Sequence, residues 1–592
     1  MSHRQVVSVA SLLVAGTVAL GAVTVRPGGL LSPTRFAAAG QEAGAPQAPD
    51  MSPTFILVNA RIWTGDSAKP RAEALAVAGD RLVAVGSNDD VRALAGATGA
   101  SAGGASGAPR VYDAGGRLVT PGFVDAHVHF LDGGFRLTSV QLRDAKTPAE
   151  FVERIRAFAA TVPSGAWITG GDWDHSLWGD RLPDRQWVDA VTPDHPVWVN
   201  RLDGHMALAN TAALRRAGIE AGVKDVEGGA IDRDTSGRLT GILRDNAMAL
   251  VERAVPPPSP EMADRALASA MRYVAERGVT SVHHMGAWSD LDVFERARSR
   301  GTLATRIYAA VPLDTWEQLR ARVVRRDARG GRGDEWLRIG ALKGFVDGSL
   351  GSRTAAFRDP FTDAPGNSGL FVNTPEQLYA WISGADRAGL HVAVHAIGDH
   401  ANQTLLDIYE RVARENGPRD RRFRVEHAQH LAPVDIPRFA KLGVIASMQP
   451  YHAIDDGRWA QRAIGPERIK TTYAFRALLD AGAHLAFGSD WYVAPPTALE
   501  GIYAAVTRRT LDDANPGGWV PDQRIAVEEA VQAYTREGAY ASFEESIKGT
   551  LAPGRLADFV VLERSLFDVR PEEIRDVRVM LTVVGGRVAF ER

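Results

Sequence analysis

The feature that most constrains the fold of this chain is a series of eight short apolar runs separated by helical stretches. The first ends at Asp125, and the others occupy residues 279–285, 305–311, 337–346, 390–395, 422–426, 444–448 and 484–488. Strand-like runs that alternate with helices are typical of βα units around a parallel sheet. Eight such units predict an α/β fold, a TIM-like (β/α)8 barrel whose active site lies at the carboxyl ends of the strands.

The two ends of the chain resemble each other in being rich in short β-like runs. Such runs occur at 55–63, 74–78 and 81–86, and again at 549–562 and 577–590. Because each group is too small to bury a core alone, we expect one composite β-sandwich formed by both ends. The expected boundaries are 54–120 and 549–592 for the sandwich, 121–548 for the barrel, about 135–260 for an insertion over the barrel mouth, and 93–109 for a surface loop.

The first 53 residues are expected to lie outside the fold. His3 and Arg4 precede an uncharged run at 6–25, and small residues follow at 37–39. This pattern is typical of a secretory signal peptide cleaved near Ala39, followed by a linker. Because the run is long for a signal peptide, an uncleaved membrane anchor stays open as the alternative. Both interpretations predict a protein exported to the periplasm or cell exterior, either secreted or anchored facing outward.

Composition and charge limit the classes of partner that the chain is expected to bind. The 592 residues carry 68 Lys and Arg against 71 Asp and Glu, a net charge of −3, which gives no electrostatic case for nucleic acid. A small-molecule substrate is the expected partner, and a membrane is expected only if the leader stays as an anchor. Cys is absent, which excludes disulfides, thiolate metal sites and cysteine nucleophiles. Monomer and homo-oligomer both stay open.

Polar side chains gather where the expected barrel strands end. His127 and His129 follow the first strand with one residue between them, so in an extended backbone both imidazoles can reach one metal ion. His395, His427 and Asp490 end the fifth, sixth and eighth strands. Any one of them alone would more often be a structural polar residue. Since the strand ends meet at one face of a barrel, the set together predicts a metal site.

The motifs that carry these residues point to a family. They are Pro-Gly-Phe-Val-Asp-Ala-His-Val-His, Leu-Lys-Gly-Phe-Val-Asp-Gly-Ser-Leu-Gly-Ser-Arg-Thr-Ala, His-Ala-Ile-Gly-Asp, Glu-His-Ala, Gly-Ser-Asp and Gly-Thr-Leu-Ala-Pro-Gly-Arg-Leu-Ala-Asp. With them, the chain from about residue 55 onward resembles the amidohydrolase superfamily, in the subgroup that includes N-substituted formamide deformylases.

The resemblance implies a pair of divalent metal ions, expected to be Zn²⁺. It places His127, His129 and Asp490 on one ion, His395 and His427 on the second, and Lys343, carboxylated by carbon dioxide, as the bridge. A carbamate has two oxygens and can span two cations, whereas an amine has a single nitrogen. A single-metal site and a salt-bridged Lys343 remain the alternatives.

Further residues are candidates for catalysis and substrate binding. Asp490 is expected to move the proton from the attacking water to the departing amine. His205 could hydrogen-bond the substrate carbonyl, with a loop-stabilising role as the alternative. Arg353 could meet a polar or anionic substrate end, or form a structural salt bridge. An apolar pocket wall, with core packing as the alternative, is expected from Trp173, Trp178 and Trp491.

These features favour an enzyme that hydrolyses a non-peptide carbon–nitrogen bond, in an N-acyl or N-formyl small molecule, by means of a metal-activated hydroxide. The same site could instead cleave an ester, lactone or phosphoester. A secreted binding or regulatory protein without catalysis is a third class, although the intact ligand set argues against it.

Overall fold

The computed structural model describes residues 52–99, 109–325 and 332–592. Of the 53 residues expected to form the leader and linker, 1–51 lie outside the described residues. Within the described part, no helix is long and apolar enough to cross a membrane.

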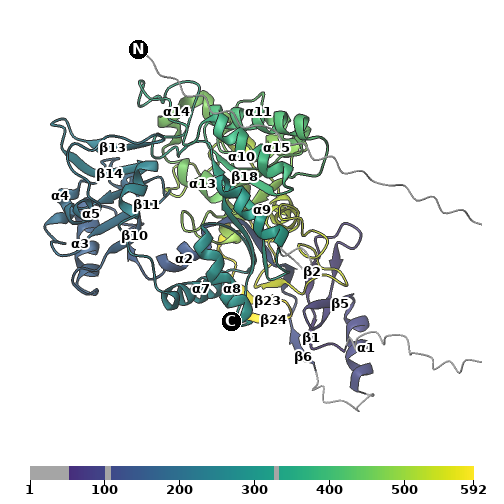
Figure 1. Ribbon diagram of the computed structural model, residues 1–592. Helices are drawn as coiled ribbons and strands as arrows, with labels where there is room; N and C mark the ends of the chain where they lie inside the picture. The colour runs from purple at the N-terminus through teal and green to yellow at the C-terminus, as the bar shows by residue number, and fades with distance from the viewer. Residues whose placement is uncertain (1–51, 100–108, 326–331) are drawn as a thin grey trace, which may run out of the picture. The chain divides into compact units, whose positions relative to one another are not determined.

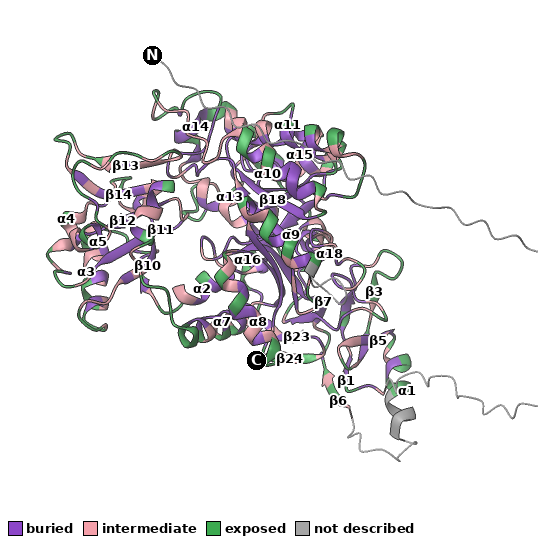
Figure 2. Cartoon of the chain, in the orientation of Figure 1, coloured by how far each residue is buried: buried purple, intermediate pink, exposed green. Residues whose placement is uncertain are grey.

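Eight parallel strands form the central sheet, as the sequence predicts (Figure 1). In chain order they are β8 (Phe123–Val128), β15 (Val279–Met285), β16 (Arg306–Pro312), β17 (Leu337–Phe345), β18 (His391–Ala396), β19 (Arg424–His427), β20 (Ile445–Met448) and β21 (Leu485–Phe487). Neighbours in the chain are neighbours in the sheet, and nearly every residue of these strands is buried, as Figure 2 shows. Burial on both faces explains why the runs are continuously apolar rather than alternating.

The sheet closes between its first and last strands. Beyond the end of β21, the Asp490 amide donates to the carbonyl of His127 at 2.7 Å, and Val128 pairs in parallel with Trp491. The buried carboxylate of Asp125 accepts from the Ser489 amide at 2.8 Å and the Ser489 hydroxyl at 2.5 Å. This contact fixes the loop that carries Asp490 against the loop that carries the two histidines.

Helices surround the barrel strands. They include α7 (Pro260–Ala275), α8 (Trp288–Ser299), α9 (Trp316–Arg325), α10 (Pro375–Arg387), α11 (Asp399–Asn416), α12 (Ile436–Leu442), α13 (Pro450–Asp456), α15 (Phe475–Asp480), α16 (Ala498–Thr507) and α17 (Val527–Ala533). The start of α10 shows how the sequence sets such boundaries. Thr374 and Gln377 satisfy each other's backbone amides in a capping box, with Pro375 at the first helical position.

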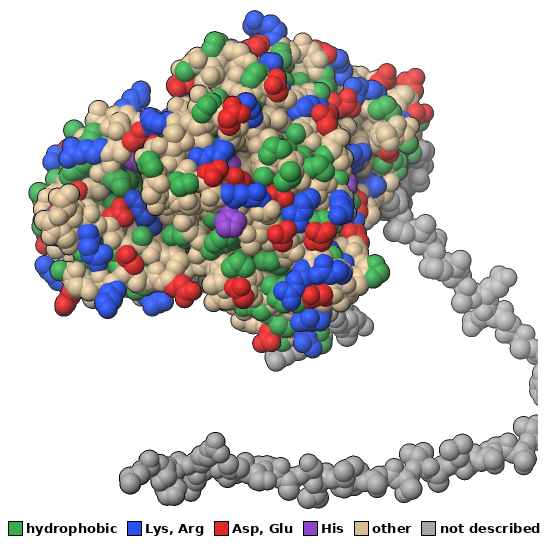
Figure 3. All heavy atoms as spheres, turned by 90° about the horizontal axis from the view of Figure 1, so that it is seen from above, with side chains coloured by type: hydrophobic (Ala, Val, Ile, Leu, Met, Phe, Trp, Pro, Cys, Tyr) green, Lys and Arg blue, Asp and Glu red, His purple; other side chains and the backbone are tan. Residues whose placement is uncertain are grey.

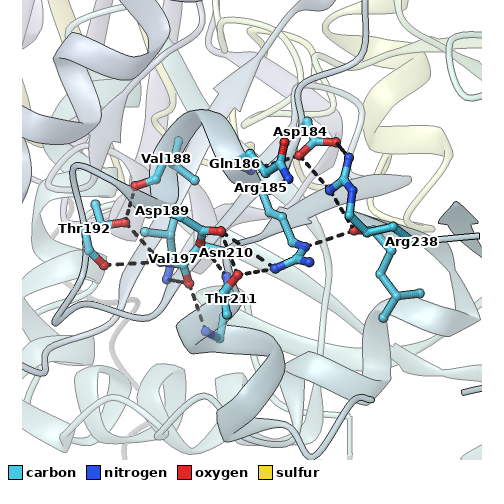
Figure 4. Close-up of polar contacts among 12 residues, drawn as sticks. Asp184, Arg185, Gln186, Val188, Asp189, Thr192, Val197, Asn210, Thr211 and Arg238 are labelled. Carbon is cyan, nitrogen blue, oxygen red and sulfur yellow. Dashed lines mark hydrogen bonds and ion pairs between the residues drawn. The ribbon is translucent and has the colours of Figure 1, made fainter. Parts of the chain in front are cut away.

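The predicted insertion is present and has a sheet of its own. Its strand order is β13 (Gly229–Arg233), β14 (Leu239–Asp245), β12 (Met206–Ala209), β11 (Val197–Arg201), β10 (Ile168–Trp173) and β9 (Val140–Gln141). Helices α3 (Pro148–Ala159), α4 (Arg185–Asp189) and α5 (Thr211–Arg216) cover it. Asn210 lies at the start of α5, where its side-chain oxygen accepts from the amides of Ala213 and Val197, each at 2.9 Å (Figure 4). Asn210 therefore caps a helix inside the insertion.

Both ends of the chain build one β-sandwich, which confirms the expectation. One sheet has the order β24 (Arg587–Glu591), β23 (Val579–Val584), β22 (Phe559–Leu562), β7 (Leu118–Pro121), β2 (Arg61–Trp63) and β3 (Arg71–Ala72). The other consists of β5 (Arg81–Gly86), β4 (Ala74–Ala78), β1 (Phe55–Val58) and β6 (Arg110–Asp113). Residues from both ends share one buried core, in which the rings of Phe55 and Phe559 lie 5.9 Å apart.

The surface loop expected at 93–109 is wrong over its first part. Residues up to Gly99 belong to helix α1 (Asn88–Gly99), while 100–108 lie outside the described residues. Ser87 and Asp90 cap this helix, since the Ser87 hydroxyl accepts from the Asp90 amide at 3.2 Å and donates to the Asp90 carboxylate at 2.6 Å. This Ser-x-x-Asp pattern was the available signal for a helix start.

Replacing Phe559 by Ala should destabilise the whole protein. The side chain is fully buried between strands from both chain ends, so its loss leaves a cavity in their shared core. We expect the free energy of unfolding to fall by about 3–5 kcal/mol, measured by denaturant titration. Val111→Ala on β6, where the side chain is 60% exposed, is the matched control and should change stability little. Equal stability of the two variants would contradict a sandwich shared by both ends.

Candidate active site and metal centre

Three of the expected ligands meet at the carboxyl end of the barrel. One ligand atom each from His127, His427 and Asp490 lies within 4.8 Å of the others. The Nε2 atoms of His127 and His129 lie 3.4 Å and 3.3 Å from Oδ1 of Asp490. Asp490 Oδ1 is buried yet has no hydrogen-bond partner within the described structure, so this oxygen is available to a metal ion.

Hydrogen bonds to the far nitrogens orient the two central imidazoles. Nδ1 of His127 lies 2.5 Å from the carboxylate of Glu426, and Nδ1 of His427 lies 2.8 Å from Oε1 of Gln449. Because each oxygen accepts a hydrogen bond from the proton on Nδ1, Nε2 keeps its lone pair and is the atom available to a metal ion. Sequence reasoning missed both partners. Glu426 was detectable as a charge on a fully buried strand, and Gln449 as the polar residue directly after β20.

The charge states suit a divalent cation. Burial, followed by the charge of Lys343, lowers the pKa of His127 to about 4, and burial holds that of His427 well below its usual value. Burial alone would raise the pKa of Asp490, but the adjacent His127 and His129 hold it well below the ordinary range. Neutral imidazoles and an ionised carboxylate are the donors that zinc-like ions prefer. The residues present therefore fit a metal centre.

The backbone at two of these residues is strained. His427 has φ +74° and Asp490 has φ +59°, both in the left-handed region that is costly for residues other than glycine. Such strain persists where surrounding structure over-determines it, and it clusters at functional sites. It marks the same residues that the ligand geometry singles out.

Lys343 lies beside this group, on β17. Its Nζ is 3.2 Å from Nε2 of His127, and the side chain is 5% exposed. Burial lowers the pKa of Lys343 to about 8, although Glu426 and Asp490 oppose the shift. Within the described residues no carboxylate forms an ion pair with this ammonium within 4.0 Å.

His395 is near the group but oriented differently. Its ring centroid lies 4.5 Å from that of His427, while its Nε2 is 3.1 Å from the carbonyl oxygen of Gly348. A proton on Nε2 satisfies that carbonyl and leaves Nδ1 as the free nitrogen. The structure thus places His395 beside the three-residue group rather than inside it.

A cleft opens at this point, between the barrel loops and the insertion. His395, His427 and Asp490 line its floor. An ion pair connects the insertion to the barrel at this cleft, where Arg458 lies 3.3 Å from Asp174. His205 also lines the cleft, with its ring 5.1 Å from that of His395.

The acidic neighbours of His205 favour its protonated form. Burial alone would lower the pKa of His205, but the carboxylate of Asp245, 2.7 Å from Nδ1, raises it above the usual value. Nε2 remains as the nitrogen that can donate to a substrate oxygen. The geometry is compatible with the carbonyl-binding role expected for His205.

The three tryptophans expected to wall the pocket do not line the cleft. Trp173 is buried in the insertion, where it donates to the Val199 carbonyl at 2.9 Å, and Trp178 packs on Phe151. Trp491 stacks on the ring of Tyr273 at 5.3 Å, against the barrel helices. All three belong to cores because their flat rings fill space between elements. The cleft is lined instead by charged side chains together with Leu202, Leu350, Ile397, Trp459 and Val493.

Arg353, expected to meet a polar substrate end or to form a structural salt bridge, is engaged away from this cleft. It forms a two-pronged ion pair with Asp363, at 2.6 Å and 3.0 Å, and lines a neighbouring cavity. Over the face shown in Figure 3, basic and acidic side chains are interspersed.

Comparison with known proteins agrees with this geometry. A model of the amidohydrolase family matches residues 110–590. The protein Long After Far-Red 3 of Arabidopsis thaliana is 39% identical over 548 residues, 90% of this chain and 91% of its own length. The N-substituted formamide deformylase of Arthrobacter pascens is 29% identical over 91% of this chain and 98% of its own.

A solved structure extends the likeness to three dimensions. An uncharacterized metal-dependent hydrolase from Pyrococcus horikoshii OT3 is similar with a TM-score of 0.70 and 27% identity, over 87% of this chain and 98% of that chain. The family match, the relatives and the barrel with its group of His and Asp side chains all agree. The chain therefore belongs to the amidohydrolase family of metal-dependent hydrolases.

Proposed function

We propose that this protein hydrolyses a carbon–nitrogen bond, other than a peptide bond, in a small N-acyl or N-formyl compound. The observation that carries the proposal is the meeting of His127, His427 and Oδ1 of Asp490 at a cleft that His427 and Asp490 line. The relative from Arthrobacter pascens, named as an N-substituted formamide deformylase, supports the choice of bond.

Six side chains would bind two metal ions. His127, His129 and Asp490 would hold one divalent ion, and His395 and His427 a second, with carboxylated Lys343 as the bridge. A buried amine whose pKa is lowered is neutral often enough to react with carbon dioxide, which supports that modification. Bound there, zinc-like ions supply a Lewis acid that lowers the pKa of a water and polarises a carbonyl.

The side chains of the cleft then handle the proton and the substrate. The Asp490 carboxylate accepts the proton of the attacking water and passes it to the departing amine nitrogen. His205, kept protonated by Asp245, donates from Nε2 to the carbonyl oxygen as negative charge develops there. The insertion limits the space and favours a small substrate.

Metal content provides the first test. The purified protein should carry close to two zinc-like ions per chain by elemental analysis, and Lys343→Ala should lose the second ion because it lacks the bridge. Short carboxylates should partly restore activity in this variant. Lys441→Ala, at an exposed position, is the control and should keep its metal. Unchanged metal content in Lys343→Ala would show that Lys343 is not a bridge.

Asp490→Asn tests the proton transfer. Asparagine keeps an oxygen ligand but cannot accept the proton, so kcat should fall by about 10²- to 10⁴-fold. Steady-state kinetics with a panel of N-formyl and N-acyl amides, esters and lactones measures the effect and the bond preference together. Asp359→Asn, an exposed change of the same kind, should leave the rate as it is. Near-normal turnover of Asp490→Asn, or turnover of esters alone, would refute the respective part of the proposal.

Glu426→Gln tests the support of the metal site. The change removes the charge that orients His127, and metal affinity should fall by about 10- to 100-fold, measured by chelator competition. Glu376→Gln, exposed on α10, is the control. If Glu426→Gln binds metal as tightly as the parent, the orientation of His127 does not depend on this carboxylate.

A further inference from the structure

One of the carboxylates that line the cleft has no ion-pair partner among the described residues. Apart from Asp490, the lining contains four carboxylates and two guanidiniums, those of Arg201 and Arg458. Three of the carboxylates are paired with these guanidiniums: Asp203 lies 2.7 Å from Arg201, Asp174 lies 3.3 Å from Arg458, and Asp455 also pairs with Arg458. Asp456 is the fourth, and within the described residues it has no ion pair.

Only one of the two carboxylate oxygens of Asp456 accepts hydrogen bonds from described side chains. Oδ2 accepts from the Gln429 amide and from the Tyr473 hydroxyl, each at 2.7 Å. These two donors fix the orientation of the carboxylate, and among the described side chains none donates to Oδ1. A fixed carboxylate with a spare oxygen, in a cleft, is suited to accept from a ligand.

A second side chain with an unused polar atom lies on the same helix face. His452 and Asp456 are four residues apart on α13, so they are neighbours on its surface, and both line the cleft. Nε2 of His452 is buried and has no partner within the described structure. The His452 ring stacks over that of His427 with centroids 6.4 Å apart, which places it next to the expected metal centre.

We propose that Asp456, with His452 beside it, binds an ammonium group on the substrate. The substrate would then be an N-acyl or N-formyl compound that carries a second, cationic nitrogen a short spacer away from the bond to be cleaved. This inference deepens the proposed function, and its catalytic part rests on it. A carboxylate accepts from an ammonium, and a neutral imidazole can accept a second N–H of the same group.

The electrostatics of Asp456 suit such a ligand. Burial raises the pKa of Asp456 to about 7, with the Tyr473 hydrogen bond opposing the shift. A cation that enters the cleft would favour the ionised carboxylate and so gain a strong contact. Asp455, next in the chain, lacks this capacity because Arg458 already neutralises it.

Two compounds that differ only at one end provide the test. One is an N-formyl alkylamine that ends in a primary amine, and the other has a methyl group in its place. The parent enzyme should show kcat/KM at least about 10-fold higher for the amine-ended compound, since charge-assisted hydrogen bonds have about this effect. In Asp456→Asn this ratio should fall to near one through KM, whereas Asp455→Asn, the matched control, should keep it.

The outcomes separate this inference from the proposed function. Isothermal titration of both compounds against Asp490→Asn enzyme measures binding without turnover. Amine-selective binding that Asp456→Asn removes, without hydrolysis in the parent enzyme, would support the inference and refute the proposed function. Hydrolysis with equal preference for both compounds would refute the inference alone. A loss of kcat for both compounds in Asp456→Asn would instead make Asp456 part of the proton transfer and overturn the binding role.

Discussion

The barrel and its site both depend on the hydrogen bonds that the Arg424 guanidinium makes. It lies inside the barrel, where it donates to Glu426 on its own strand at 2.7 Å, to the Ala126 carbonyl on β8 at 2.6 Å and to Ser447 on β20 at 2.9 Å. It also contacts Nδ1 of His283 on β15 at 2.9 Å. One side chain thus connects four strands. Burying this charge is tolerable only because nearly all of its donors are used.

Through Glu426, the same contact reaches the reactive end of the barrel. The carboxylate shares its oxygens between Arg424 and His127, so a structural ion pair in the barrel interior also sets the tautomer of a candidate metal ligand. Stability and chemistry are therefore coupled here. A substitution that disturbs the packing inside the barrel would therefore also change the orientation of His127, without altering any residue that lines the cleft.

Much of the fold and part of the site followed from local sequence patterns. The eight strands were predictable because strands buried on both faces are continuously apolar, and His127, His427 and Asp490 because topology places strand ends together. The roles of Trp173, Trp178 and Trp491 were not predictable, since an aromatic ring in an insertion of unknown pairing can face a core or a cleft. The orientation of His395 depends on the Gly348 carbonyl, which is distant in sequence. The unpaired state of Asp456 depends on which carboxylates two arginines reach, and no sequence pattern contains that information.

The composite sandwich has a consequence for the order of events during synthesis. Strand β22 pairs with β7, so Phe559 lies opposite Pro121, more than 400 residues earlier in the chain. Contacts this distant are slow to form, and strands that wait for their partners expose apolar edges. While the ribosome makes the barrel, β2 and β7 have no partner from the far end. The last strands to be made therefore complete the first, and a chain interrupted late would be left with an open, aggregation-prone sheet.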